Sequence, residues 1–259
     1  AGALAGFVCS FPGLHQVGET RQLKHVSHIL GVLPHVQSQG LGFALKQAQR
    51  SLVRQQGIPL ITWTYDPLLS RNAHLNIHRL GAVCRTYFRD YYGVMRDDLN
   101  RGLPSDRFQV EWWLESERAE AGSLSLQPQR NGLPQVLNPA AAGEQGWLEP
   151  AADPAGFELT VLPGEVAVEI PLDFLALKAA QPELALRWRL HSRAWFESLF
   201  SQGFTVVDYI YQPGSPGRGY YCLSRQLIEG VKPCRSKASP CTTCACRWLR
   251  PSRPPSGGF

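Results

Sequence analysis

The chain has 259 residues, of which 44% are hydrophobic and 18% are charged, a composition that is ordinary for a globular protein. Of its 26 Lys and Arg, six lie in residues 231–259 without any acidic neighbour, and the remaining 20 are matched by 21 Asp and Glu. The body of the chain therefore has no basic surplus, which argues against nucleic-acid binding. No apolar run approaches the roughly 18 residues of a membrane span, the cysteines demand no oxidising compartment, and the N-terminus has no secretory leader, so we expect a cytoplasmic protein.

The first residues predict a strand over 3–11, a polar loop over 13–22 and a second strand over 24–33. Pro12-Gly13 should end the first strand. Pro34 cannot donate to a ladder, so the second strand should end before it.

An amphipathic helix is predicted next, over residues 41–56. The apolar side chains that recur at helical spacing are Ala44, Leu45, Ala48 and Leu52. Gly40 and Gly42 then lie where the first amides of the helix have no carbonyl partner, and such a helix N-terminus attracts anions, above all phosphate. An ordinary strand, turn and helix, with glycines needed only for positive φ, would leave the same pattern.

Beyond this helix the pattern alternates between strands and helical segments. Strands are expected over 60–65, 83–87 and 108–114, with a turn at Asp66-Pro67 and a helical segment over 70–80 closed by Gly81. Residues 115–155 are polar and rich in Pro and Gly, which is typical of an exposed connection.

The last folded part is expected to be α+β. Residues 157–162 and 165–170 predict a hairpin around Pro163-Gly164. Helices follow through Leu199 with an interruption near Pro182, and the final strands are expected over 204–211 and 220–223.

Two blocks of this sequence resemble a known family. Gln37-x-x-Gly40-x-Gly42, after a strand that ends in Gly31-Val32-Leu33-Pro34, resembles the acyl-coenzyme A signature of the GNAT N-acetyltransferase superfamily. The block from Trp63 to Ala82 is similar to the family's second block, whose short helix carries Ala and ends in Leu-Gly-Phe. Ala73, Leu80 and Gly81 match it, whereas Ala82 replaces the aromatic residue.

The resemblance, to a two-part family of predicted GNAT acyltransferases, covers roughly residues 1–226 and lacks the family's opening strand and two helices. It implies an α/β (α+β) fold with a mixed, mostly antiparallel, twisted sheet and flanking helices. We accordingly expect a GNAT-like domain over 1–114, a linker or long loop over 115–155, a C-terminal α+β domain over 156–226, and a tail over 227–259 that is too biased in composition to fold.

The resemblance also implies a donor and a reaction. Acetyl-CoA or another acyl-CoA would give its acyl group to an amine by direct attack in a ternary complex. The turn amides would hold the pyrophosphate, pantetheine would lie beside the strand, and an amide near Val32 would polarise the thioester oxygen. The expected cofactor-binding residues are Leu30, Val32, Leu33, Gln37, Gln39, Gly40, Leu41 and Gly42.

Three side chains are candidates for proton transfer. His28 is a candidate base, because Val26 stands where the family can have Glu and strand alternation puts His28 on the same face. Asp66 competes with it, although Asp before Pro is also a turn former. Ile77 replaces the Tyr that acts as acid in many family members, so we consider His78 instead, with Asn76 and Tyr65 as further alternatives nearby.

Two other groups of residues have ordinary interpretations as well as functional ones. Arg189 and Arg193 share a helix face, which could hold a substrate carboxylate or be simply ion-paired. The tail cysteines, Cys234, Cys241, Cys244 and Cys246, have the wrong spacing for a zinc site, so no metal is expected.

The alternative to an enzyme is a noncatalytic CoA- or ligand-binding protein with a degenerate GNAT fold. For the enzyme, we expect a small-molecule amine or amino acid as acceptor, with no nucleic-acid or membrane partner. A homodimer is left open.

Overall fold

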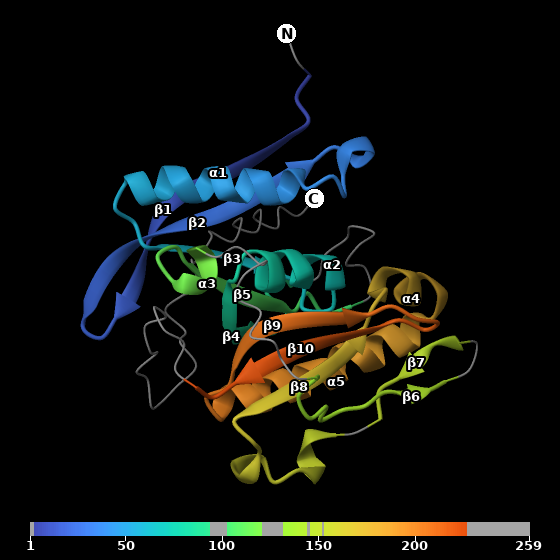
Figure 1. Ribbon diagram of the computed structural model, residues 1–259. Coiled ribbons are helices and arrows are strands. Elements are labelled where there is room, and N and C mark those ends of the chain that lie inside the picture. The colour runs from blue at the N-terminus through green and yellow to red at the C-terminus, as the bar shows by residue number, and fades with distance from the viewer. Residues whose placement is uncertain (1–2, 94–102, 121–131, 144–145, 152, 227–259) are drawn as a thin grey trace, which may run out of the picture.

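The computed structural model describes residues 3–93, 103–120, 132–143, 146–151 and 153–226 (Figure 1). An eight-stranded sheet runs through the molecule in the order β1-β2-β3-β5-β4-β9-β10-β8. Its strands are β1 (Gly6–Val17), β2 (Thr20–Val32), β3 (Leu60–Tyr65), β4 (Val83–Phe88), β5 (Arg107–Trp113), β8 (Glu165–Pro171), β9 (Thr205–Gln212) and β10 (Arg218–Ser224). A separate two-stranded ladder joins β6 (Ala141–Ala142) to β7 (Leu148–Glu149).

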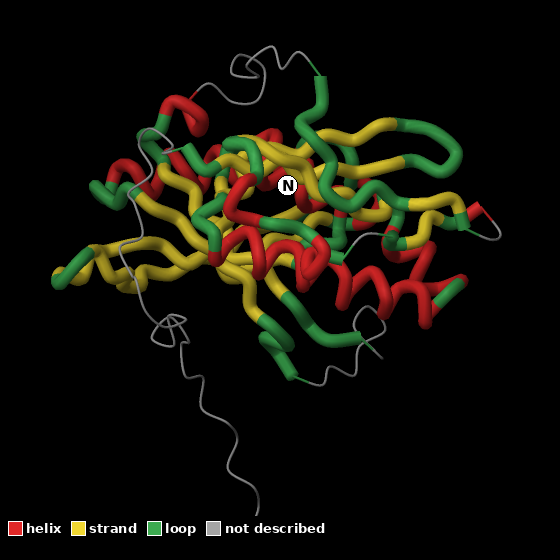
Figure 2. Tube along the Cα trace, turned by 90° about the horizontal axis from the view of Figure 1, so that it is seen from below, coloured by secondary structure: helices red, strands yellow, loops and turns green. Residues whose placement is uncertain are grey.

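Helices pack against this sheet, which Figure 2 shows as a twisted layer seen from below. Figure 1 places α1 over the β1–β2 hairpin and α5 beside β8, β9 and β10. None of the described helices combines the length and the apolarity that crossing a bilayer requires. The α-helices are α1 (Leu41–Gln55), α2 (Ser70–Ala73), α3 (Glu117–Glu120), α4 (Phe174–Ala180) and α5 (Pro182–Ser201); α2 continues into the π-helical η2 (His74–Arg79), and 3₁₀ turns form η1 (Pro34–Val36), η5 (Pro154–Gly156) and η6 (Leu159–Val161).

The sheet is mostly antiparallel, with one parallel neighbour pair, β2 and β3. The helix α1 connects those two strands, which is how adjacent parallel strands must be joined. A mixed, mostly antiparallel sheet with flanking helices confirms the predicted α/β (α+β) fold class.

One hydrophobic core extends across both halves of the chain. It runs from Val53 of α1 to Leu223 of β10 and includes Trp112, Trp188 and Trp195, all fully buried. Between the halves, β4 and β9 share a single ladder pair, Cys84 with Val206. The predicted domain boundaries stay a prediction, but sheet and core are continuous across them.

The predicted loop over residues 13–22 is wrong. The first strand continues through Pro12-Gly13 to Val17, and the chain reverses at Gly18, whose φ is +60°. Since β1 lies at the edge of the sheet, where proline is tolerated, Pro12 does not end it.

The predicted hairpin over 157–170 is also wrong. Residues 159–161 form the 3₁₀ turn η6, and β8 pairs with β10, with Glu165 opposite Ser224. The apolar run before Pro163-Gly164 was too short to tell a strand from a turn. Parts of the expected linker are also packed, since Leu137 and Leu148 are 1% and 4% exposed.

Candidate functional site

The parallel strands β2 and β3 stay together for only two ladder pairs. These join His25 to Ile61 and Val26 to Thr62. Beyond them each strand continues, to Val32 and to Tyr65, but no further ladder pair joins the two. The sheet thus forks after Val26, and we call this point the fork.

A β-bulge lies in β2 just beyond the fork. Cys9 of β1 is opposite Ile29, whereas the next residue, Ser10, is opposite Ser27, so His28 is the extra residue of the bulge. A bulge bends its strand and interrupts the alternation of faces. The regular alternation from which we placed His28 on the face of Val26 is therefore broken at His28 itself.

The predicted phosphate turn follows directly after the fork. Ser38 and Gly40 both have positive φ, of 64° and 81°, and α1 begins at Leu41. The first amides of α1 have no helical carbonyl to donate to, and no acidic side chain lies in its first turn. The positive end of the helix dipole is left without a compensating side chain on its first turn.

Arg71, at the start of α2, contacts this turn from the next segment of the chain. Its Nη1 donates to Gln37 Oε1 at 3.2 Å and its Nη2 donates to Ser38 Oγ at 3.1 Å. Gln37 in turn donates to the carbonyl oxygen of Val32 at 3.0 Å. The exposed guanidinium therefore adds a positive charge beside the amides, which the sequence reasoning missed because α2 is 33 residues away along the chain.

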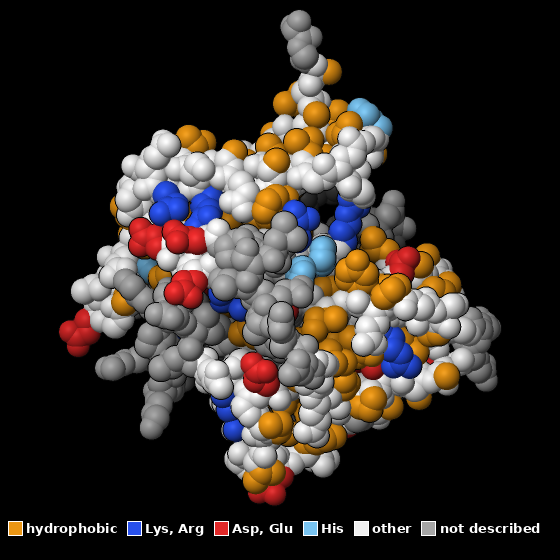
Figure 3. All heavy atoms as spheres, viewed as in Figure 1, with side chains coloured by type: hydrophobic (Ala, Val, Ile, Leu, Met, Phe, Trp, Pro, Cys, Tyr) orange, Lys and Arg blue, Asp and Glu red, His pale blue; other side chains and the backbone are white. Residues whose placement is uncertain are grey.

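The helix α1 and the α2–η2 segment meet along a seam. The Arg79 guanidinium lies 4.4 Å from the centre of the Phe43 ring, and a Cβ on Gly42 would lie 3.8 Å from both Leu30 and Leu75. Figure 3 shows Lys or Arg and His side chains gathered along this seam, below α1. The turn, the fork and the basic side chains thus face one region.

The face of α1 that packs on the sheet is not the apolar stripe that its sequence predicts. The buried residues are Lys46, Gln49 and Val53, whereas Leu52 is 61% exposed. The polar side chains are buried because β2 supplies polar partners beneath them. Ser27 is one such partner and is 6% exposed.

Lys46 is the unusual residue of this layer. Its Nζ donates to Ser27 Oγ at 2.7 Å and to Gln49 Oε1 at 3.2 Å, and it lies 3.6 Å from the centre of the Trp63 ring. Burial lowers the pKa of Lys46 to about 7, because removal from water disfavours the charged form.

His25 extends the polar layer toward the C-terminal end of α1. Its Nε2 is 2.8 Å from Gln56 Oε1, and its Nδ1 is 3.2 Å from Ser10 Oγ. Both ring nitrogens are therefore engaged by side chains. The candidate base His28 is placed differently: it is exposed, and its ring lies 5.7 Å from that of Phe11.

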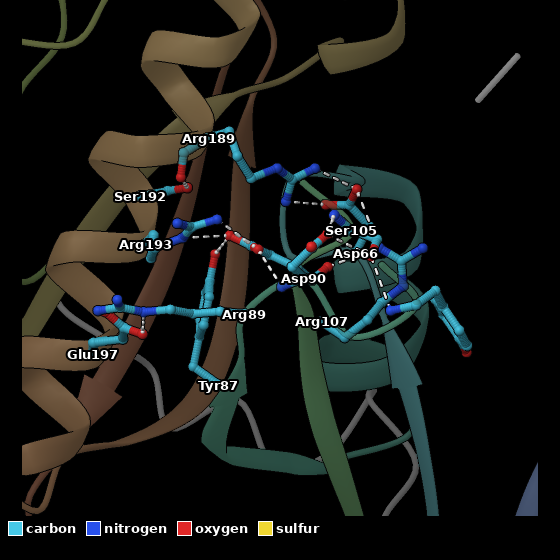
Figure 4. A network of polar contacts seen from close by, with 12 residues as sticks. Asp66, Tyr87, Arg89, Asp90, Ser105, Arg107, Arg189, Ser192, Arg193 and Glu197 are labelled. Atoms are coloured by element: carbon cyan, nitrogen blue, oxygen red, sulfur yellow. Dashed lines mark hydrogen bonds and ion pairs between the residues drawn. The ribbon is translucent and has the colours of Figure 1, made fainter. Parts of the chain in front are cut away.

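Asp66, the second candidate base, lies in a buried ion-pair network (Figure 4). Arg189 Nη1 donates to Oδ1 at 2.8 Å and Nη2 donates to Oδ2 at 2.5 Å. The Leu68 amide also donates to Oδ1, and Arg107 Nη1 is 3.8 Å from Oδ2. Both carboxylate oxygens are thus held by the protein's own donors, which fits a positioning role for Asp66.

Arg193, one turn further along α5, makes the matching contact with Asp106. Its Nε and Nη2 each donate to one oxygen at 2.8 Å. The Tyr87 hydroxyl and the Asp90 amide donate to the same carboxylate. Burial raises the pKa of Asp106, but these hydrogen bonds outweigh it, so the pKa is lowered overall. The two arginines do share a face, and both are ion-paired within the protein.

His78, the candidate acid, is oriented by a residue from the second half of the chain. Its Nδ1 is 3.0 Å from Asp208 Oδ1 of β9, and its ring stacks on His74 with centroids 4.9 Å apart. Burial, followed by the neighbouring His78 and Arg79, lowers the pKa of His74.

The other candidate acids are buried in the core. Ile77, at the position where the resemblance puts Tyr, is 0% exposed, and Asn76 is 5% exposed. The Tyr65 hydroxyl is 3.1 Å from that of Tyr221, which donates to the Pro67 carbonyl, and burial raises the pKa of Tyr65 well above its usual value.

Within the described ranges, no group of three or more His, Cys, Asp or Glu could hold a metal ion. The four tail cysteines lie outside the described residues.

The chain was compared with protein families, curated proteins and solved structures, and only the last comparison found a similarity. No protein-family model matches the sequence, and no curated protein matches it. Among solved structures, the chain is similar to a protein from Desulfovibrio desulfuricans assigned to the GNAT family of acetyltransferases, with 21% identity and a TM-score of 0.32. The match covers 42% of this chain and 62% of that protein, so the chain spans less than two thirds of its length.

Proposed function

We propose that the chain binds an acyl-CoA thioester and transfers the acyl group to an amine. The observation that carries this proposal is the fork: a parallel strand pair of two ladder positions that parts and leads, on one side, into the N-terminal turn of α1. Parting strands expose backbone amides and carbonyls to a ligand that can pair with them, and the turn attracts an anion.

The residues at the turn suit a diphosphate. The amides of Leu41 and Gly42 would face the diphosphate oxygens. The Arg71 guanidinium, which donates to Gln37 and Ser38, could donate to a phosphate oxygen in their place. Apart from its chain neighbours, no residue that the structure describes lies within 4 Å of a Cβ built on Gly40, which leaves room for a ligand on that side of the turn. Leu30, Val32 and Leu33 would lie beside pantetheine, with Gln39 on the rim of the turn.

The reaction needs a neutral amine and an exit for its proton. The amine nitrogen forms a bond to the thioester carbonyl carbon, the carbon–sulfur bond breaks, and the amine's proton ends on the thiolate or on solvent. His28 is the base we propose, because it is exposed at the bulge beside the fork. His78, oriented by Asp208, is the proposed acid. Asp66 positions the end of β3 through Arg189.

A noncatalytic CoA-binding protein is the second candidate, and one observation favours it. Ile77 is buried where the resemblance puts an acidic Tyr, so the binding elements are more complete than those for proton transfer. For the enzyme, we further propose a small amine or amino acid as acceptor and a cytoplasmic setting.

Two measurements separate these candidates. Calorimetric titration with CoA tests binding, and release of free thiol from acetyl-CoA or succinyl-CoA in the presence of an amine panel tests turnover. Binding with turnover supports the enzyme, and binding without turnover supports the second candidate. Absence of both refutes the proposed site.

A further inference from the structure

Lys46 holds its amine at the fork. Its two side-chain contacts outside α1 are Ser27 and Trp63. These are the first residues after the last ladder pair, Val26 with Thr62, on β2 and β3 respectively. The amine therefore lies where the two strands begin to part, beneath α1.

This amine has no anionic partner among the residues that the structure describes. Lys46 is 3% exposed, and its contacts are a hydroxyl, an amide oxygen and an indole ring. The same polar layer also contains His25, whose two ring nitrogens are engaged by Gln56 and Ser10. Buried lysines are normally paired, because an isolated ammonium is costly to remove from water.

We propose that Lys46 selects an acyl group that ends in a carboxylate, so that the donor is a dicarboxylic acyl-CoA such as succinyl-CoA. The inference rests on the proposed function and names its donor class. An incoming carboxylate supplies the anion that the protein's own residues do not, and Ser27 and Gln49 hold the amine in place to receive it.

The length of the acyl group follows from the strand. Pantetheine beside Leu30 and Val32 sets the thioester on the part of β2 beyond the bulge. A strand rises about 3.3 Å per residue, and the bulge at His28 adds no ladder position, because Leu30 and Ser27 lie opposite Val8 and Ser10 of β1, two residues apart. Ser27 therefore lies roughly 7 Å from Leu30 along β2. An acetyl group ends well short of the amine, whereas a four- or five-carbon chain with a terminal carboxylate spans most of that gap.

Binding of such a donor should carry a proton signature. Burial lowers the pKa of Lys46 to about 7, so at pH 8 most of the amine is neutral in the free protein. A carboxylate beside it favours the ammonium and raises this pKa, so the complex takes up a proton. A neutral acyl group of the same length has no such effect.

The test compares succinyl-CoA with butyryl-CoA, which has the same number of acyl carbons and no terminal charge. Calorimetry at pH 8 in two buffers with different ionisation enthalpies gives both affinity and proton uptake. The wild-type protein should bind succinyl-CoA about 10- to 100-fold more tightly, with net proton uptake. Lys46→Met should lose the preference and the uptake while it keeps its affinity for butyryl-CoA.

Each of the following outcomes counts against the inference. If the wild-type protein binds both thioesters equally, or if Lys46→Met keeps the preference, Lys46 does not select the donor, and the proposed function stands. If neither thioester binds, the proposed function fails together with the inference. Lys46→Arg is the second variant, because it keeps a cation: it should retain part of the preference, and equal binding of both thioesters by a folded Lys46→Arg would count against a charge-based selection.

Discussion

Replacing Arg189 with Gln should destabilise the protein by several kcal/mol. Arg189 and Asp66 form a bidentate pair in which the side chains are 2% and 11% exposed. Removing one partner of a buried pair costs about 3–5 kcal/mol, because it leaves a charge buried without compensation. Arg107, 3.8 Å from the same carboxylate, remains as a partial substitute. We therefore expect a loss of about 3 kcal/mol, the lower end of that range.

The measurement is urea unfolding followed by tryptophan fluorescence, with Arg187→Gln as the matched control. Arg187 lies two residues away on the same helix and pairs with Glu149 at 2.7 Å, but the two side chains are 53% and 36% exposed. An exposed pair of this kind contributes about 0–1 kcal/mol. The two variants remove the same chemical group from the same helix and differ in burial.

A loss no larger for Arg189→Gln than for Arg187→Gln would refute the reasoning. The double variant Asp66→Leu with Arg189→Met adds a second check. Because it removes both charges and fills their volume with apolar atoms, it should recover most of the stability lost in Arg189→Gln. If the double variant is less stable than the single one, the loss comes from packing around Arg189 and not from the unpaired carboxylate.

Three further predictions concern ligand binding and pH. Arg71→Met removes one positive charge beside the turn, so it should weaken CoA binding by about tenfold and reduce the salt dependence of binding. Titration calorimetry at two ionic strengths measures both, and unchanged affinity would exclude Arg71 from the site. Burial lowers the pKa of His191 to about 4, so the unfolded chain takes up this proton at a higher pH than the folded protein. The melting temperature should therefore fall as the pH drops from about 6.5 to 4, and it should fall less steeply in His191→Gln. Burial likewise lowers the pKa of Lys46 to about 7, so the free energy of unfolding should rise between pH 7 and about 10.5. Urea unfolding across this range should show no such rise in Lys46→Met, and a rise of the same size in the variant would mean that other groups cause it.

Local pattern was enough for the elements near the turn. The strand over 60–65 is observed with those bounds, and α1 ends one residue before its predicted end. Both segments carry strong local signals, a β-branched and aromatic run in one and a glycine start in the other. The Gln37 to Gly42 turn could be located for the same reason.

The contacts that give the site its character could not be read in the same way. Asp66 meets Arg189 across 123 residues of sequence, and no local pattern reports such a pairing. Lys46 stood in a helix whose apolar side chains suggested the opposite face. Its burial depends on Ser27 and Trp63, which belong to two strands that the sequence alone cannot place beneath that helix. Polar groups that are buried with polar partners break the rule that apolar residues mark the buried face.

The junction between β4 and β9 bears on how the chain could be divided. Since a single ladder pair, Cys84 with Val206, joins the two halves of the sheet there, few backbone hydrogen bonds hold this line together. Side chains do most of that work, including the Arg189–Asp66 and His78–Asp208 contacts. Two fragments separated between β5 and β8 would therefore reassociate mainly through a packed and charged surface, and ionic strength would tune how well they complement each other.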